Sequence, residues 1–594
     1  MKVLVTPIEF PAWTRSRDRI LSWLARVLLG LLLCSALTAQ QKHKAPHKKH
    51  KAPPAKAQAA GTKAAPEEHV DPLDAVVQTL LRASLEHDPG IALRGGWSRS
   101  GELPLGTYGT DAAIAWRAAL DRARARLARL RPSGPSPAQA EVLALRAWVE
   151  SELLLVDSLG TTRTDPARYV RHVTRTLEAV RRADGLDQGT RTTQLARFLF
   201  DLPAYWRDAR TSLVSPSPVS IESALLELDE LEELVAGVDL VPYGPPAPGP
   251  APSAELDPAR SVTAFREWLL DERAIATTPP DRLGPEEWTR FVQLRTGCAW
   301  TRGQIKARCL RDLAAVTPAP VEAGAIGHTL DGKPIARAVW NTSARTLALG
   351  QLAGWFAPEQ SPDLLRVLAE PAAPTRVEPL ELSVAGDALV AAVHLPDWRW
   401  SRERSLTRAD GLQPRGLAAL GVRYGLAGEG AWMLAACRSK SKAALLDHRE
   451  LREGLGLFAL DWTLALDVPE NPLHRDPEIE AEFARQRGLE AARLLAALEL
   501  HAEEASLAEV QAGLQRRTGM DAETAYAEAV RAVGDPAWGL GTLVLYELRA
   551  LESALAASGH ASDARARTIG LALQHPHLRP VDLSSFCVEP EPAR

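Results

Sequence analysis

Two glutamates and two histidines in the C-terminal third of this 594-residue chain are the residues best suited to metal chemistry: Glu429, Glu453, His448 and His501. Carboxylate and imidazole groups bind zinc, and a carboxylate can also act as a general base towards a metal-bound water. Helical zinc sites usually place two histidines one turn apart, and no two histidines of residues 67–594 have that spacing. We therefore expect no catalytic residue, no metal site and no other cofactor.

Each of these side chains also has an ordinary structural role open to it. A glutamate near the start of a helix, where Glu453 is expected, is stabilised by the helix dipole. A histidine on an apolar helix face, as His501 would be, is commonly a buried side chain with a hydrogen-bond partner. The residue types alone leave both alternatives open.

Helices are expected to position these residues. Gly416 to Trp462 reads as two helical segments separated by a polar turn, and it contains both glutamates. A long helix is predicted from His474 to Ala505 and carries His501. A shorter helix from Asp521 to Ala532 carries Arg531, a further candidate site residue.

Two segments of this region resemble motifs of a zinc peptidase. The first motif reads HExxPGHH and lies over Arg423 to Gly430, where Gly428 is its one retained residue. The second reads EGWAxYxE and begins at Glu453, which is retained, while Leu460 replaces the final glutamate. Both segments keep the frame of a metal site and change its ligands.

Two further segments follow in the same order. The third motif reads RLxxDxGxH and lies over Arg493 to His501, which keeps the Arg, Leu and His and lacks the Asp and Gly. The fourth reads ExxRYxxxPGQAxxY and lies over Glu528 to Thr542, which keeps the Glu, Arg and Pro. Ala532 and Thr542 stand at its two Tyr positions.

With these four motifs in order, the chain resembles the bacterial domain of unknown function 885 family, a mostly helical group related to gluzincin-type metallopeptidases. The resemblance covers roughly Asp71 to Leu583 and is strongest after Arg415. It implies an all-α, two-lobed fold with a cleft, and it implies that one set of residues lines a common cavity: Tyr424, Glu429, Glu453, His501 and Arg531. It also implies loss of the metal ligands and of the Tyr donors.

Composition independently favours an all-α body. The chain is 46% hydrophobic, and Ala, Leu, Arg and Glu, which are good helix formers, dominate it. Capping acids or hydroxyls followed by proline predict helix starts at Asp71, Ser136 and Asp165. Two consecutive helices are predicted at Gln194–Phe200 and Leu202–Leu213. His575-Pro576-His577 is interpreted as a surface loop after the last helix.

One segment has strand periodicity instead. Thr375 to Leu395 alternates apolar and polar residues on either side of Gly386-Asp387, which predicts a small β-hairpin. A Pro-rich stretch at 242–257 is expected to connect an N-terminal helical part, 67–241, to a C-terminal part, 258–594.

The N-terminus has the features of export. Four arginines precede an apolar run from Val27 to Ala39, so residues 1–39 are expected to be a signal peptide or signal anchor. Leu31-Leu32-Leu33-Cys34 resembles a lipobox, although Leu33 fits its consensus poorly. Residues 40–66 contain Lys, His, Ala and Pro and no acid, which predicts a disordered linker. An extracytoplasmic location follows, whether periplasmic, secreted or membrane-anchored.

Charge is divided unevenly between the tail and the body. Residues 1–66 carry eight Lys and four Arg against two acids, and the whole chain is −4, so the remainder is −14. An acidic body argues against nucleic acid as a partner. The basic linker either contacts a membrane or cell-wall polymer or serves as a solvated spacer.

Cysteines are few after residue 39. Cys298, Cys309, Cys437 and Cys587 are expected to be small buried side chains, and a disulfide is the alternative.

These observations favour a secreted or envelope-associated pseudopeptidase with a binding or scaffold role, whose cleft would take a peptide or protein ligand. The alternative is an active zinc-dependent peptidase with displaced ligands. A third interpretation is an envelope protein tethered by its basic tail.

Overall fold

Several helices begin where a capping side chain is followed by proline. The Asp71 carboxylate accepts a 2.8 Å hydrogen bond from a backbone N–H at the start of α2 (Pro72–His87). The Ser136 hydroxyl accepts a 3.3 Å hydrogen bond from a backbone N–H three residues on, at the start of α5 (Pro137–Leu159). Proline fits the first turn because the N–H it lacks has no partner there. Both predicted helix starts are confirmed.

The computed structural model describes residues 71–87, 109–131, 136–182, 188–236, 257–276, 282–314, 316, 332–357, 360–371, 379–385, 388–396, 400–446 and 448–586. The predicted signal segment 1–39, the linker 40–66, Cys587 and all of the connector 242–257 except Asp257 lie outside these residues. Contacts divide the chain into Met1–His69 and Val70–Arg594, and the fold below is that of the second unit.

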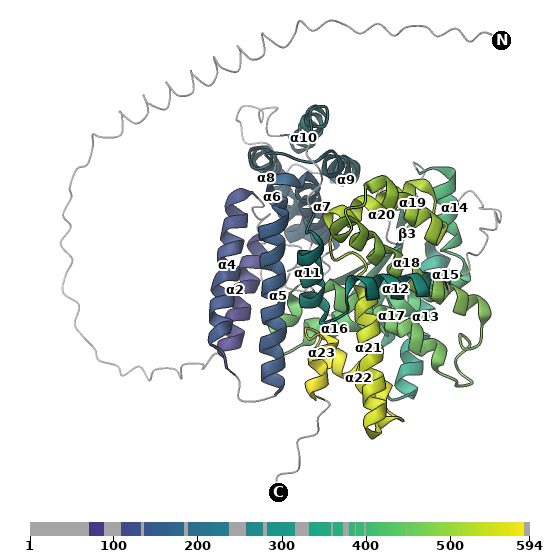
Figure 1. Cartoon of the computed structure of the whole chain (residues 1–594). Coiled ribbons are helices and arrows are strands. Elements are labelled where there is room, and N and C mark those ends of the chain that lie inside the picture. Colours follow the sequence, from purple (N-terminus) through teal and green to yellow (C-terminus); the bar gives the residue numbers. More distant parts are fainter. Residues whose placement is uncertain are drawn as a thin grey trace, which may run out of the picture. The chain divides into compact units, whose positions relative to one another are not determined.

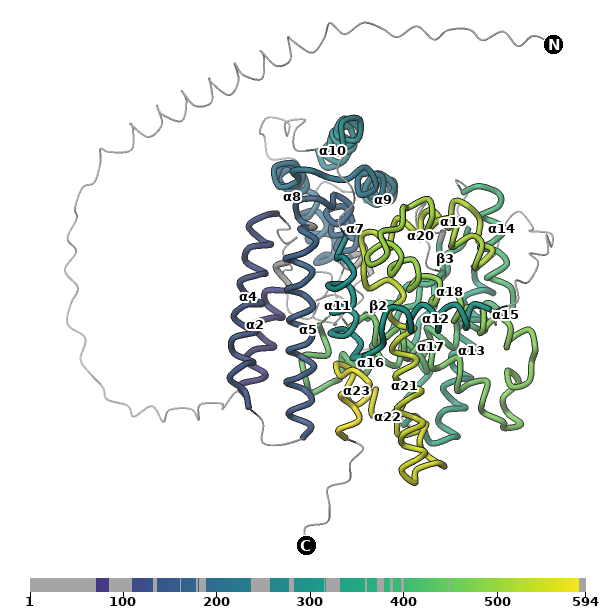
Figure 2. Tube along the Cα trace, in the orientation of Figure 1, coloured from purple at the N-terminus to yellow at the C-terminus, as the bar shows by residue number. Residues whose placement is uncertain are grey.

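Three long helices lie side by side at the start of this unit, as Figures 1 and 2 show: α2, α4 (Thr110–Arg129) and α5. Trp116 of α4 meets Trp148 of α5 edge to face, with 6.3 Å between ring centroids. Their core also contains Ala443 and Leu446. Helices from the beginning of the chain therefore pack against the region that carries the motifs.

A second group of helices encloses its own apolar core. It comprises α7 (Pro166–Arg182), α8 (Gln188–Ser212), α9 (Pro218–Ala236) and α10 (Pro258–Arg273), and the short α6 (Thr161–Thr164) precedes α7. Although α9 and α10 flank the predicted connector, they share this core. The predicted pair of helices at 194–213 is wrong, because α8 is one helix with Pro203 inside it. Pro203 is buried, so packing on both sides offsets the hydrogen bond that proline removes.

A third core surrounds the long helix α18. Its helices are α11 (Pro285–Thr296), α12 (Arg302–Ala314), α18 (Pro477–Ala502), α19 (Leu507–Thr518) and α20 (Ala522–Gly534). The second half of α18 is buried on all sides, from Glu490 to Ala502. The long helix and the α20 helix that follows it confirm the predictions for this region.

The largest core joins the remaining helices to the sheet. These helices are α13 (Gly332–Leu352), α14 (Arg402–Asp410), α15 (Pro414–Arg423), α16 (Glu429–Arg438), α17 (Arg449–Ala465), α21 (Gly541–Leu555), α22 (Ala564–Gln574) and α23 (Pro580–Leu583). Short helical turns lie at η3 (Pro362–Leu364), η4 (Lys442–Leu445), η5 (Ala556–His560) and η6 (Ser584–Phe586).

The sheet has three strands in the order β1-β3-β2. As predicted, β2 (Leu380–Ala385) and β3 (Ala388–Leu395) are antiparallel, and Leu382 pairs with Ala391. The alternating apolar residues of both strands face the largest core. The prediction omitted β1 (Leu365–Pro371), which pairs in parallel with β3. Parallel pairing joins segments that are distant in sequence, so no turn signal marks it.

The described residues form a mainly helical protein with this small sheet, which confirms the predicted fold class. Within that part of the chain, no helix combines the length and apolar character needed to cross a bilayer.

Candidate functional site

The segment that resembles the first metal-site motif forms the tight connection between α15 and α16. Arg423 ends α15 and Glu429 begins α16. Helix α17 packs directly on this connection, because a Cβ on its Gly456 would lie 2.6 Å from Glu429 Cγ and 3.0 Å from the Arg423 carbonyl oxygen. Glycine at 456 therefore allows the close approach that brings the two candidate glutamates, Glu429 and Glu453, to neighbouring helices.

Arg423 occupies the centre of a buried ionic network. Its side chain is 3% exposed, and its guanidinium pairs with Glu429 at 3.3 Å and with Glu490 of α18 at 2.8 Å. Arg452 of α17 pairs with the other oxygen of Glu429 at 3.1 Å. Burial opposes the charged form of Arg423, but its carboxylate neighbours raise its pKa. Arg423 is thus a fixed cation surrounded by carboxylates.

Arg493 extends the network along α18 and into α20. It pairs with Glu490 at 2.6 Å and with Glu528 at 2.5 Å. Burial raises the pKa of Glu490, but the guanidiniums of Arg423 and Arg493 outweigh it and lower that pKa to about 2. Glu528 also accepts a 2.9 Å hydrogen bond from the indole N–H of Trp538. Glu490 is therefore ionised, and both glutamates are paired with arginine.

Glu453 lies at the edge of the network. Arg449, one turn earlier on α17, donates to Glu453 at 2.6 Å and to Asp535 at 2.6 Å. Burial raises the pKa of Glu453, and Glu490 and Glu429 raise it further against the effect of Arg449. Its Oε2 atom is buried without a hydrogen-bond partner. The charged form of Glu453 is therefore disfavoured by its surroundings.

Three guanidiniums lie against the indole ring of Trp538. Arg449, Arg493 and Arg531 lie 4.5, 4.6 and 4.6 Å from its ring centroid. These cation–π contacts and the bond to Glu528 fix the ring between α17, α18 and α20. Arg531 is thereby placed beside the network.

His501 lies outside the ion pairs. It is 1% exposed, and its Nε2 donates to the Ala532 carbonyl oxygen at 2.9 Å. Burial lowers the pKa of His501 to about 4, so the imidazole is neutral at pH 7. Its Nδ1 is buried without a hydrogen-bond partner. These contacts are those of a buried histidine with a backbone hydrogen-bond partner, which is one of the two alternatives left open by the sequence.

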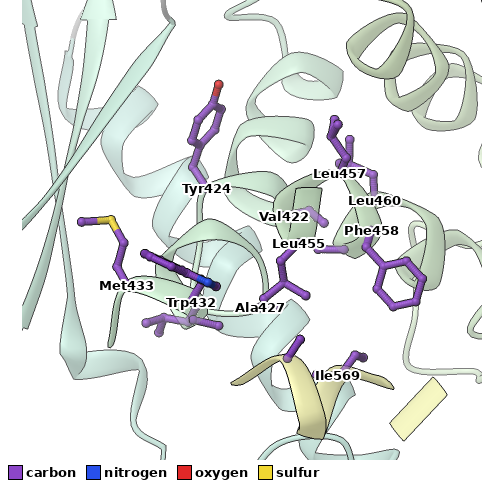
Figure 3. Packing of buried hydrophobic residues seen from close by; sticks show 14 of the residues in the cluster. Val422, Tyr424, Ala427, Trp432, Met433, Leu455, Leu457, Phe458, Leu460 and Ile569 are labelled. Carbon is purple, nitrogen blue, oxygen red and sulfur yellow. The ribbon is translucent and has the colours of Figure 1, made fainter. Parts of the chain in front are cut away.

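Tyr424 follows Arg423 and lies under its guanidinium, 4.8 Å from the ring centroid. Burial raises the pKa of this hydroxyl. In Figure 3 the ring of Tyr424 points away from the apolar cluster formed by Trp432, Leu455 and Phe458. Tyr424 therefore marks the boundary between that apolar packing and the ionic network.

Glu429 and Tyr424 thus share Arg423 as a neighbour, and Glu453 pairs with Arg449. Arg449 and Arg531 both lie against Trp538, and His501 contacts Ala532 of α20. A common cavity among these five side chains remains a prediction. Sequence reasoning did not propose most of the network as site residues, although Arg493 and Glu528 are retained motif positions: Arg449, Arg452, Glu490, Arg493, Glu528, Asp535 and Trp538. The available signal was the spacing of Arg449 to Glu453 and of Glu490 to Arg493, which is typical of helical ion pairs.

The His575-Pro576-His577 segment is not a surface loop. His577 is 3% exposed, and the indole N–H of Trp432 donates to the Pro576 carbonyl oxygen at 3.0 Å. His577 Nε2 lies 3.8 Å from a Glu141 carboxylate oxygen. The predicted surface loop is wrong because residues of α5 and α16 cover this segment, although its own composition is typical of a turn.

The residues at this site do not fit a zinc ion. Glu429 and Glu453 face guanidiniums, which would repel a divalent cation, and His501 already donates to a carbonyl oxygen. Across the described ranges, no group of three or more His, Cys, Asp or Glu residues is arranged to hold a metal. The Nε2 atom of His448 is likewise engaged by a protein group, because it lies 3.1 Å from the Ala443 carbonyl oxygen.

Comparison with known proteins shows the fold. No family model matches the chain, and no curated protein sequence matches it significantly. A "putative lipoprotein of unknown function" from Shewanella oneidensis has a TM-score of 0.60 at 13% identity, and the match covers 87% of this chain and 100% of that one. A "putative lipoprotein" from Colwellia psychrerythraea has a TM-score of 0.63 at 11% identity, covering 87% of this chain and 99% of that one. The chain shares its fold with these two bacterial proteins.

Proposed function

We propose that this chain is an envelope-associated helical protein that binds a peptide or protein partner, or serves as a scaffold, and that it has no peptidase activity. Its export-type N-terminus supports an extracytoplasmic location. The two solved structures of the same fold are described as putative lipoproteins, which supports envelope association.

The pairing of the candidate carboxylates with arginines is the observation that carries the inactive assignment. Arg423 stands at the position that resembles the first zinc-binding histidine, and its guanidinium contacts Glu429. Arg449 similarly contacts Glu453. Hydrolysis of an amide by a metallopeptidase needs a water whose pKa the metal has lowered to about 7. An arginine supplies positive charge and keeps the buried acids paired. It cannot coordinate a water molecule as a metal does, so it cannot activate that water for amide hydrolysis.

The first test measures zinc and hydrolysis together. The purified full chain is analysed for bound zinc and incubated with a mixed peptide library, with and without a chelator. We expect substoichiometric zinc and no cleavage. Stoichiometric zinc with chelator-sensitive cleavage that Glu453→Ala abolishes, and that Glu552→Ala leaves unchanged, would establish the alternative of an active zinc peptidase. Glu552 is a suitable control because it pairs with Arg565 at 2.7 Å away from the network.

The second test concerns attachment to the envelope. Cys34 follows Leu31-Leu32-Leu33, and lipidation of its thiol would anchor the chain. Fatty-acid incorporation and detergent partition of the native chain, with neither in Cys34→Ser, would assign the attachment to this thiol. Export without lipid would instead assign attachment to the apolar segment or to the basic linker at 40–66, and recovery of the full-length chain in the cytosol would refute the extracytoplasmic location.

A further inference from the structure

The bundle formed by α7, α8, α9 and α10 has an apolar core of its own. Its buried side chains form a cluster separate from the three other clusters of the described residues. Stacked and edge-to-face aromatic rings run through its centre, among them Trp206 and Phe265 with 4.4 Å between ring centroids. A group of helices that buries its apolar surface internally satisfies the main requirement of an independent lobe.

A hydrogen bond joins this bundle to α20. On α9, Glu222 accepts a hydrogen bond from the Tyr526 hydroxyl of α20 and also pairs with Arg273 of α10. At another edge of the bundle, the Ser212 hydroxyl accepts a 3.1 Å hydrogen bond from the Thr110 backbone N–H. None of these contacts needs apolar surface to be exposed when it breaks.

A group of charged residues continues the same boundary beside the end of α20. A Cβ on Gly534 would lie 3.2 Å from an Arg171 guanidinium nitrogen of α7, so the two elements are in close contact. Arg171 pairs with Glu227 of α9 at 2.9 Å. It also acts electrostatically on Asp535, together with Arg449 and Arg531, and these three arginines lower the Asp535 pKa against burial. Asp535 therefore interacts electrostatically with Arg171 of the bundle and with Arg449 and Arg531 beside the ionic network.

These contacts remain partly accessible to water. The side chains of Arg171 and Glu227 are each 21% exposed, and that of Asp535 is 23% exposed. Glu227 also has a buried oxygen, Oε2, without a hydrogen-bond partner. Water can solvate these charged side chains when the two surfaces separate. The apolar core on each side would instead stay intact, because exposing it to water is unfavourable.

We propose that helices α7, α8, α9 and α10 move as one rigid cap against the rest of the body along the α9–α20 boundary. Opening would separate Glu222 from Tyr526 and Arg171 from Asp535, and it would expose the Arg449–Glu453 edge of the network. Polar boundaries between separately packed lobes permit such motion, and added salt favours the open form by screening the attraction between Arg171 and Asp535. This inference does not depend on the absence of peptidase activity.

Distance measurements between spin labels on the full chain test the cap. Leu270 of α10 is 48% exposed, Phe200 of α8 is 64% exposed, and Leu352 at the end of α13 is 66% exposed. Labelled cysteines at 270 and 352 report across the boundary, and labelled cysteines at 200 and 270 report within the bundle. The background carries serine at Cys34, Cys437 and Cys587; Cys298 and Cys309 are buried.

We expect the 270–352 distribution to be broader than the 200–270 distribution and to shift when salt is raised. Tyr526→Phe, which removes one hydroxyl from the boundary and keeps the ring, should broaden the 270–352 distribution further and leave the other unchanged. A 270–352 distribution as narrow as the internal one, insensitive to salt and to Tyr526→Phe, would refute the cap. Circular dichroism of each variant confirms that it is folded before the comparison is made.

Discussion

Replacing Arg423 with methionine tests whether the buried network holds the centre of the protein together. The substitution keeps the length of the aliphatic stem and removes the cation. It leaves Glu429 and Glu490, whose side chains are 3% and 2% exposed, without one partner each. Breaking a buried ion pair in this way typically costs about 3–5 kcal/mol. Because Arg452 still pairs with Glu429 and Arg493 still pairs with Glu490, we expect a loss near the lower limit.

The assay is equilibrium urea unfolding of the full chain, followed by far-ultraviolet circular dichroism. Arg117→Met is the matched control, because Arg117 is 47% exposed and pairs with Asp121 and Asp157 on the surface. Removing this exposed pair should cost much less than breaking the buried one, because solvent screens it. The double variant Arg423→Met/Glu490→Leu should recover part of the loss, because it removes a buried charge as well as its partner. Equal effects of Arg423→Met and Arg117→Met would refute the assignment of Arg423 as the central cation.

Three further predictions concern pH, packing and thiols. Burial lowers the pKa of His501 to about 4, below its ordinary 6.5, so the unfolded chain binds the proton first and stability falls from pH 6.5 towards pH 4. His501→Gln should reduce that slope by about 1.4 kcal/mol per pH unit near pH 5, and urea unfolding with an unchanged slope would contradict this. Gly456→Ala should destabilise by about 1–3 kcal/mol through its contact with Glu429, whereas Gly570→Ala, which meets nothing within 4 Å, should not destabilise. Burial raises the thiol pKa of Cys298 and Cys309 to about 12, so both should react with thiol reagents only after unfolding.

Local sequence signals were sufficient for most helices and for the antiparallel strands. Caps such as Asp71 and Ser136 act within the first turn, and the alternation from Leu380 to Val393 specifies which strand face is buried. Such signals depend on residues two to four positions apart. They failed where packing overrides local preference, as at Pro203 inside α8 and in the buried segment around His577.

The motifs proposed a location for the candidate site and gave no indication of its ion pairs. They predicted one site for Glu429, Glu453 and Arg531; the structure pairs Glu429 with Arg423 and Glu453 with Arg449, and it places Arg531 against Trp538. The motifs gave no indication that Arg423 would contact Glu490, because these residues are 67 positions apart. Their pairing depends on how α15 and α18 pack, which no local pattern encodes.

The sequence by itself determined the helical class, the helix starts, the hairpin and the export-type N-terminus, since each follows from neighbouring residues or from composition. The tertiary structure alone decided that the acids of the motif region are paired with buried arginines, that β1 joins the sheet in parallel, and that α7 to α10 form a separate core. The physical reason is range. Capping and periodicity act within a few residues, whereas ion pairs and apolar cores depend on which distant surfaces folding brings into contact.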